Sequence, residues 1–164
     1  MRVRQTTDTD SQKCILMSVA KDAFHLAYNV KMSAEDSDTA EVTLYGEIVE
    51  NMPSFYKYFY PEDKSGAEFK KEIDKVRKDG ATKLKLRINS PGGVCTEAVA
   101  MRSVLADAGF DEIVILIEGL CASAATTVAT IPGAHVLIAE GSEYMIHNPW
   151  CYTYGSANEL EHTI

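Results

Sequence analysis

The feature that most constrains the fold is an uninterrupted apolar run, Ile113-Val-Ile-Leu-Ile117, bounded by Glu112 and Glu118. A strand with one exposed face alternates apolar and polar residues, whereas this run is apolar at every position. The run therefore predicts an interior strand that is covered on both faces.

Strands and helices alternate on either side of this run. Phe69, Ile73 and Val76 form one apolar stripe of a predicted helix. Capping-box spacing at Ser65 begins this helix, and Gly80 ends it. The other predicted elements are strands over 41–48, 84–88, 112–118, 135–139 and 144–147, and helices over 94–108 and 122–131. This alternation predicts an α/β fold, with a layered parallel sheet and flanking helices.

The first forty residues carry weaker signals and are predicted to be an N-terminal extension, 1–40. Residues 14–19 and 24–30 are predicted to form a hairpin. Residues 51–61 are rich in Phe and Tyr, and they either pack as a loop against the core or form an exposed contact surface. Ser156 begins a last capping box, but Ile164 follows so soon that this helix needs more chain or a partner to be stable.

Composition and charge exclude several classes of protein. Of 164 residues, 46% are hydrophobic and 24% are charged, as in one globular domain rather than a disordered chain. The net charge of −8 argues against a general nucleic-acid binder, which needs a basic face. Residues 119–139 contain no Asp, Glu, Lys or Arg, but Pro132-Gly133 interrupts them. They therefore indicate buried core rather than a membrane span.

The cysteines say little about metal or disulfide chemistry. Cys14, Cys95, Cys121 and Cys151 form no CxxC pair and lack zinc-ligand spacing. The first residues also lack the apolar core of a secretory signal. We therefore expect reduced thiols, no metal site and a cytoplasmic location.

Three short segments at strand ends carry residues that are suited to catalysis. They are 89–93 (Asn-Ser-Pro-Gly-Gly), 119–126 (Gly-Leu-Cys-Ala-Ser-Ala-Ala-Thr) and 144–149 (Tyr-Met-Ile-His-Asn-Pro). Functional groups of an open α/β sheet gather at the ends of its strands. We therefore expect the three segments to converge on one point.

Ser123 follows a strand and begins a predicted helix. Its hydroxyl would lie near unpaired backbone N–H groups, and the N–H of Ala124 is placed to bind the oxyanion that forms when Ser123 attacks a carbonyl. The alternative is that Ser123 only caps its helix. Cys121 and Cys95 flank the motifs as alternative thiol nucleophiles, although both also fit small buried positions.

The two other segments supply a second N–H donor and a base. The N–H of Gly93 is the candidate second oxyanion donor, and the alternative is an ordinary strand-to-helix turn. His147 is the candidate base, because a serine hydroxyl needs one to lose its proton, and the alternative is a structural histidine. The other histidines, His25, His135 and His162, have no comparable context.

Together the three segments resemble motifs of the Clp protease proteolytic subunit and of the phage head-maturation (prohead) proteases that share its fold. The matching residues are Ser90-Pro-Gly-Gly93, Gly119-Leu-Cys-Ala-Ser123 and Met145-Ile-His-Asn-Pro149. The intervals of 30 residues from Gly93 to Ser123 and 24 from Ser123 to His147 are also similar to the family's. The resemblance covers roughly residues 42–160.

The resemblance implies a Clp-protease/crotonase-like fold of repeated ββα units over residues 41–164. It implies a serine endopeptidase without a cofactor, in which Ser123 is the nucleophile and His147 the base. The N–H groups of Gly93 and Ala124 would form the oxyanion hole. The third triad residue of the family is an Asp well beyond the His, so we expect a chain truncated at its C-terminus that lacks this residue and part of a helical layer.

Details of the sequence resemble the phage-type branch more than the housekeeping enzyme. These are Asn148, Trp150 and the segment 51–61. For that branch the implied substrates are capsid or scaffold proteins, the implied assembly is a homo-oligomeric ring, and the implied location is the host cytoplasm or the assembling prohead. No nucleic-acid or membrane partner is implied. Two alternatives stay open: a crotonase-like acyl-CoA enzyme, which needs neither Ser123 nor His147, and a non-catalytic assembly module of the same fold.

Overall fold

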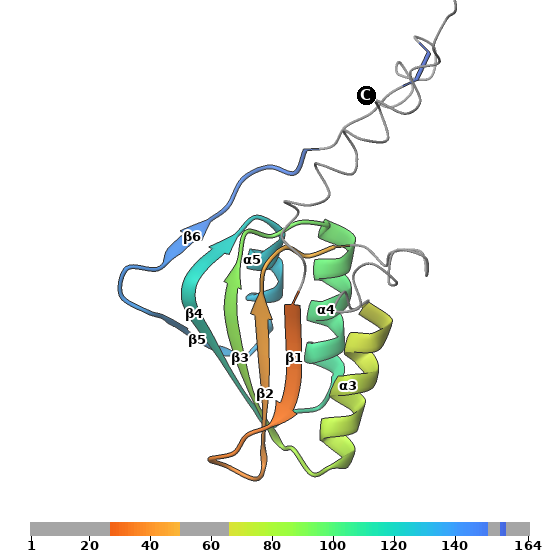
Figure 1. Ribbon diagram of the computed structural model, residues 1–164, viewed down its shortest axis with the longest axis vertical. Coiled ribbons are helices and arrows are strands. Elements are labelled where there is room, and N and C mark those ends of the chain that lie inside the picture. Colours follow the sequence, from red (N-terminus) through yellow and green to blue (C-terminus); the bar gives the residue numbers. More distant parts are fainter. Residues whose placement is uncertain (1–26, 50–65, 151–154, 157–164) are drawn as a thin grey trace, which may run out of the picture.

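The computed structural model describes residues 27–49, 66–150 and 155–156, and its centre is a six-stranded sheet (Figure 1). The strands follow the order β1-β2-β3-β4-β5, and β6 pairs with the far end of β4. β1 (Ala27–Met32) runs antiparallel to β2 (Thr39–Tyr45). The other strands pair in parallel: β3 (Lys83–Ser90), β4 (Glu112–Ala122), β5 (His135–Ile138) and β6 (Glu143–Met145). This arrangement confirms the predicted α/β fold.

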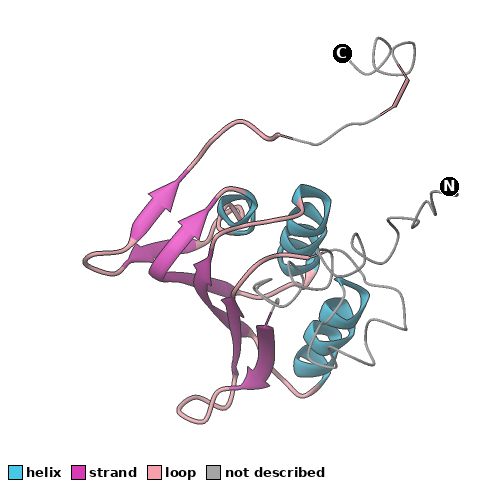
Figure 2. Ribbon diagram, turned by 45° about the horizontal axis from the view of Figure 1, so that its top comes forward, coloured by secondary structure: helices cyan, strands magenta, loops and turns pink. Residues whose placement is uncertain are grey.

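The three described helices cover one face of the sheet (Figure 2). They are α3 (Gly66–Lys78), α4 (Cys95–Asp107) and α5 (Ala124–Val128). Successive side chains of a strand point to opposite faces, so every second residue of β2, β3 and β4 meets these helices. The fully buried strand residues include Val42, Leu44, Leu86, Ile88, Ile115 and Ile117, which pack in one core with Phe69, Ile73 and Leu105 of the helices.

In the described part of the chain the opposite face of the sheet is open, which corrects the prediction that β4 is covered on both faces. On this face Val114 and Leu116 are partly exposed among the described residues. A continuous apolar run thus does not require two covered faces: Ile113, Ile115 and Ile117 lie in the helix-covered core, and the two residues between them do not.

A charged network crosses this open face. Arg87 on β3 contacts Glu41 of β2 at 3.0 Å and Glu118 of β4 at 2.7 Å. The Tyr45 hydroxyl donates a further hydrogen bond to Glu118. Hydrogen bonds from Arg87 lower the pKa of both Glu41 and Glu118, because they favour the charged carboxylates. The network links the strands just before the turns that carry the site.

Most predicted elements are present, but the region after β4 differs from the prediction. The strand continues to Ala122, and the helix spans only Ala124–Val128 rather than 122–131. Between them Ser123 has φ +52°, a conformation that no helical residue adopts. The strand predicted over 144–147 ends at Met145. Residues 14–19, 51–61 and Ser65, and all but Ser156 of the last capping box, lie outside the described residues.

The charge-free stretch 119–139 is only partly core. Most residues from Cys121 to Ile131 are buried, as predicted. β5 is not: Val136, Leu137 and Ile138 are 44%, 54% and 57% exposed. The prediction was wrong for β5, because it lies at the sheet edge beyond the reach of the described helices. No helix in the described part of the chain combines the length and apolar character that crossing a bilayer requires.

Candidate active site

Ser123 forms a sharp turn between β4 and α5. Its φ of +52° and ψ of −125° make it the only non-glycine residue with a positive φ in the described part of the chain. Its hydroxyl makes no capping hydrogen bond to α5, so the alternative that Ser123 only caps this helix finds no support. A strained backbone at a side chain that is free of local hydrogen bonds is typical of a functional position.

The ring of His147 meets this hydroxyl: Nε2 lies 2.7 Å from Ser123 Oγ. β6 produces the contact, because it pairs in parallel with the end of β4 and places Met145 beside Ala122. The N–H of Ser123 then donates to the carbonyl of Met145 at 2.9 Å. His147 follows two residues after β6, and its ring has no other hydrogen bond to a described residue.

Gly92 packs directly against the turn at Ser123. It has φ +92°, and a Cβ added there would lie 2.5 Å from the carbonyl oxygen of Ala122 and 2.7 Å from the nitrogen of Ala124. These distances are far below van der Waals contact, and both atoms belong to the backbone. Only glycine therefore allows the two turns to approach this closely.

Gly93 lies next to Gly92 and also lines the site. Gly93 forms a parallel bridge with Ile48, in which the N–H of Ile48 donates to Gly92 and the N–H of Val94 donates to Ile48. Because both bonds of Ile48 go to the neighbours of Gly93, the N–H of Gly93 itself points away from Ile48. Neither this N–H nor that of Ala124 donates to another described residue. The role of these two groups as oxyanion donors stays a prediction.

Two residues that support the glycine turn were missed by the sequence reasoning. Ser90 is fully buried, and its Oγ accepts the N–H of Gly92 at 3.1 Å. Ile48 is also fully buried and holds the turn through both its N–H and its carbonyl. Ser90 belongs to the motif, and a buried hydroxyl after a strand could have been noted. Ile48 carries no local signal, because its role is long-range backbone pairing.

The two thiols near the site make no hydrogen bond to His147. Cys121 is buried, and burial raises the pKa of its thiol to about 11, so the thiol is neutral at physiological pH. Cys95 is exposed at the start of α4. The hydrogen bond of His147 goes to the hydroxyl of Ser123 and to neither thiol.

An open hollow of about 710 Å³ surrounds the Ser123–His147 pair. Its wall includes both glycines of the turn, and Met145, Trp150 and Glu47 border it. Both apolar and polar side chains thus surround the hydroxyl. Trp150 is 69% exposed.

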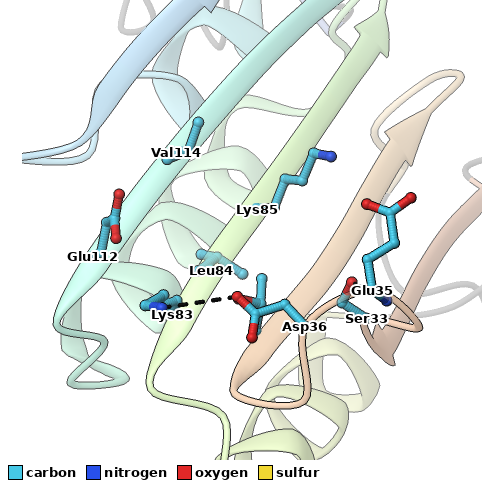
Figure 3. Close-up of a pocket in the computed structure, with 9 residues that line it drawn as sticks. Ser33, Glu35, Asp36, Lys83, Leu84, Lys85, Glu112 and Val114 are labelled. Carbon is cyan, nitrogen blue, oxygen red and sulfur yellow. Dashed lines mark hydrogen bonds and ion pairs between the residues drawn. The ribbon is translucent and has the colours of Figure 1, made fainter.

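A second hollow, of about 330 Å³, lies at the other end of the strands (Figure 3). Lys83 and Glu112, the first residues of β3 and β4, line it, and Lys83 pairs there with Asp36 at 3.8 Å. Its described lining contains no histidine beside a hydroxyl. We therefore place the candidate active site at the Ser123 end of the sheet only.

A comparison with protein-family models gives a match. The family model described as Clp protease matches residues 72–164, more than half of the chain. The matched range contains the glycine turn, Ser123 and His147. A search of curated proteins gives no match.

Proposed function

This chain belongs to the Clp protease family, and on that premise we propose that it is a serine endopeptidase with Ser123 as nucleophile and His147 as general base. The observation that carries the proposal is the 2.7 Å contact between His147 Nε2 and Ser123 Oγ. A hydroxyl needs such a neighbour to lose its proton at neutral pH. The family match supports the same reaction class.

The proposed reaction is acyl transfer through two tetrahedral intermediates. Neutral His147, with its proton on Nδ1, takes the hydroxyl proton at Nε2 while Ser123 Oγ bonds to the peptide carbonyl carbon. The N–H groups of Gly93 and Ala124 stabilise the oxyanion. The imidazolium then protonates the leaving amine, and water, activated by the same ring, hydrolyses the acyl-enzyme.

The substrate we propose is an extended polypeptide. The N–H and carbonyl of Gly93 face away from Ile48, so they form a short free strand edge beside the hydroxyl. A peptide can add to such an edge through main-chain hydrogen bonds, which select little on side-chain identity. The finer proposal is that the substrates are phage capsid or scaffold proteins and that the enzyme works as a homo-oligomeric ring. Its support is the phage-type residues Asn148 and Trp150 and the segment 51–61.

A serine-reactive fluorophosphonate tests the chemistry. We expect it to label the wild-type protein at Ser123 and to leave Ser123→Ala unlabelled. His147→Gln should slow labelling by about 10³-fold, the usual contribution of a general base. Ser103→Ala is the matched control, because Ser103 lies on the exposed side of α4 and bonds only the carbonyl of Val99 among the described residues.

Three results would contradict the proposal. A wild-type protein without label would favour the crotonase-like acyl-CoA alternative, which needs no Ser–His contact. Head assembly that survives Ser123→Ala would favour the non-catalytic assembly module. Peptide cleavage that survives Ser123→Ala would show that Ser123 is not the nucleophile. For the finer proposal, purified capsid and scaffold proteins should be cleaved by the wild type and not by Ser123→Ala. If unstructured peptides are cleaved while capsid and scaffold proteins stay intact, the finer proposal alone is refuted.

A further inference from the structure

A β-bulge interrupts the pairing of β3 and β4 just before both turns of the site. Up to Ile88, which faces Ile117, the register is regular. The next pair is Ser90 with Cys121, so three residues of β4 lie opposite Asn89 alone. A bulge of this kind changes which residues face one another beyond it.

The bulge decides where Ser123 lies relative to the glycine turn. It shifts β4 by two residues against β3, and two residues of a strand span about 6.6 Å. With this shift Ser123 lies against Gly92, where an added Cβ would be 2.8 Å from Ser123 Cβ. In the register of the earlier pairs Gly92 would face Cys121, and the hydroxyl would lie beyond the turn.

The side chain of Asn89 occupies the bulge. Its Oδ1 accepts the N–H of Leu120 at 3.0 Å, and its backbone carbonyl accepts the N–H of Gly46 at 3.0 Å. Gly119 leaves room for the amide, since a Cβ there would lie 2.7 Å from Oδ1. Asn89 thus joins the ends of β2 and β4 to β3.

We propose that Asn89 is a positioning residue for the Ser123 hydroxyl: its side-chain oxygen holds the bulge that brings Ser123 beside Gly92 and Gly93. The inference rests on the proposed role of Ser123 as nucleophile. Asn89 has no hydrogen bond to Ser123 or His147, so it acts through β4. A regular ladder would satisfy the N–H of Leu120 with backbone, whereas at the bulge the exposed side chain of Asn89 supplies the acceptor.

The first test measures the bulge itself and needs no catalysis. In Asn89→Leu, which keeps the size and removes the acceptor, the amide of Leu120 should exchange with solvent at least about tenfold faster. The nuclear Overhauser contacts between Gly92 and Ser123 should weaken in the same variant. Asn89→Asp keeps the acceptor oxygen and should retain both signals. Asn29→Leu is the matched control, an exposed asparagine on β1.

The second test measures the nucleophile. Asn89→Leu should lower kcat for a peptide and the fluorophosphonate labelling rate by about 100-fold, with KM changed less than about threefold, because misplacement mainly costs transition-state geometry. Asn89→Asp should recover most of the rate. A merely structural loss would instead lower the amount of folded protein and leave kcat of the folded fraction unchanged.

The third test uses the fit between Asn89 and Gly119. Gly119→Ala places a methyl group against Oδ1 and should slow labelling by about tenfold. In the Asn89→Ala background the same change should cost less than about threefold, because the opposing atom is gone. Equal losses in both backgrounds would contradict a direct contact.

The outcomes separate this inference from the proposed function. If the wild type is not labelled, the proposed nucleophile fails. The role of Asn89 can still be tested in that case: it is wrong if Asn89→Leu leaves both the exchange rate of the Leu120 amide and the Gly92–Ser123 contacts unchanged. If the wild type is labelled and Asn89→Leu is labelled at the same rate, the nucleophile stands and the positioning role is wrong.

Discussion

The two residues that meet at the site are held in different ways. Ser123 lies between buried residues of β4 and α5, and its turn packs backbone to backbone against Gly92. His147 lies in an exposed segment, whose neighbour Ile146 is 72% exposed. Among the described residues, three paired residues of β6 and the hydrogen bond from Ser123 to Met145 attach that segment to the sheet.

The difference shows how a fold can position a nucleophile and a base with unequal stability. Close packing leaves Ser123 no alternative position, because the nearby atoms are backbone and cannot move apart cheaply. Backbone pairing of β6 and a hydrogen bond to Ser123 hold His147 in an exposed segment, and such segments open more easily than a packed core. We therefore expect substitutions on the two sides to differ strongly in their effect on stability.

The largest expected effect is on the nucleophile side, at Gly92. Gly92→Ala adds a Cβ 2.5 Å from the Ala122 oxygen at φ +92°, so we expect a loss of about 2–4 kcal/mol in the free energy of unfolding. Denaturant unfolding measures it. Gly80→Ala is the control: its φ is +105° but an added Cβ there meets nothing within 4 Å, so only the backbone cost of about 1 kcal/mol applies. Equal losses would show that steric contact at Ser123 is unimportant.

A smaller effect on stability is expected at the ion pair that links β3 to β4 on the open face. Arg87 lowers the pKa of Glu118 in the folded state, so this ion pair stabilises the fold above the unfolded pKa of about 4.3 and is lost as pH falls through the folded value. Because Arg87 is 36% exposed, Glu118→Gln should cost only about 0.5–1 kcal/mol at pH 7. The cost should shrink as the pH falls below about 4.3 towards the lowered pKa of the folded state.

Thermal unfolding of wild type and variant across this pH range provides the measurement. Glu112→Gln, at the start of the same strand and without an ion pair among the described residues, should show no such pH dependence. A cost for Glu118→Gln that stays constant down to pH 3 would mean that the side chain stabilises by packing and not by charge.

The smallest effect is expected beside the base. Ile146→Ala should change the free energy of unfolding by less than about 0.5 kcal/mol, because the side chain is mostly exposed. Ile117→Ala, the same substitution at a fully buried position of β4, should cost about 2–5 kcal/mol. A large cost at Ile146 would show that its face is covered in solution, and the contrast between the two sides would disappear.

Local pattern was enough to predict the α/β fold and most of its elements. The alternation at Leu84, Leu86 and Ile88 depends only on neighbouring residues, and the structure confirms β3 there. Pattern failed where the outcome depends on distant partners. The exposure of Ile138 follows from its edge position, which the residues around it do not encode.

The candidate site was predictable to the same degree. Ser123 and His147 stand out because their chemistry is visible in the sequence, and the structure brings their side chains together. Asn89 belongs to a predicted motif, but the sequence indicates no role for it. Its hydrogen bond joins two strands in a register that no local pattern reveals. Supporting residues of this kind need the pairing of strands to be known first.

The positive φ of Ser123 has an evolutionary consequence. A non-glycine residue in this region of backbone space costs about 1–3 kcal/mol, and glycine adopts it freely. Replacing Ser123 by glycine would therefore make the fold more stable while removing its hydroxyl. In a lineage that no longer depends on the hydroxyl, a change from serine to glycine stabilises the fold, whereas alanine keeps the strain of the positive φ. We therefore expect inactive descendants to acquire glycine here sooner than alanine.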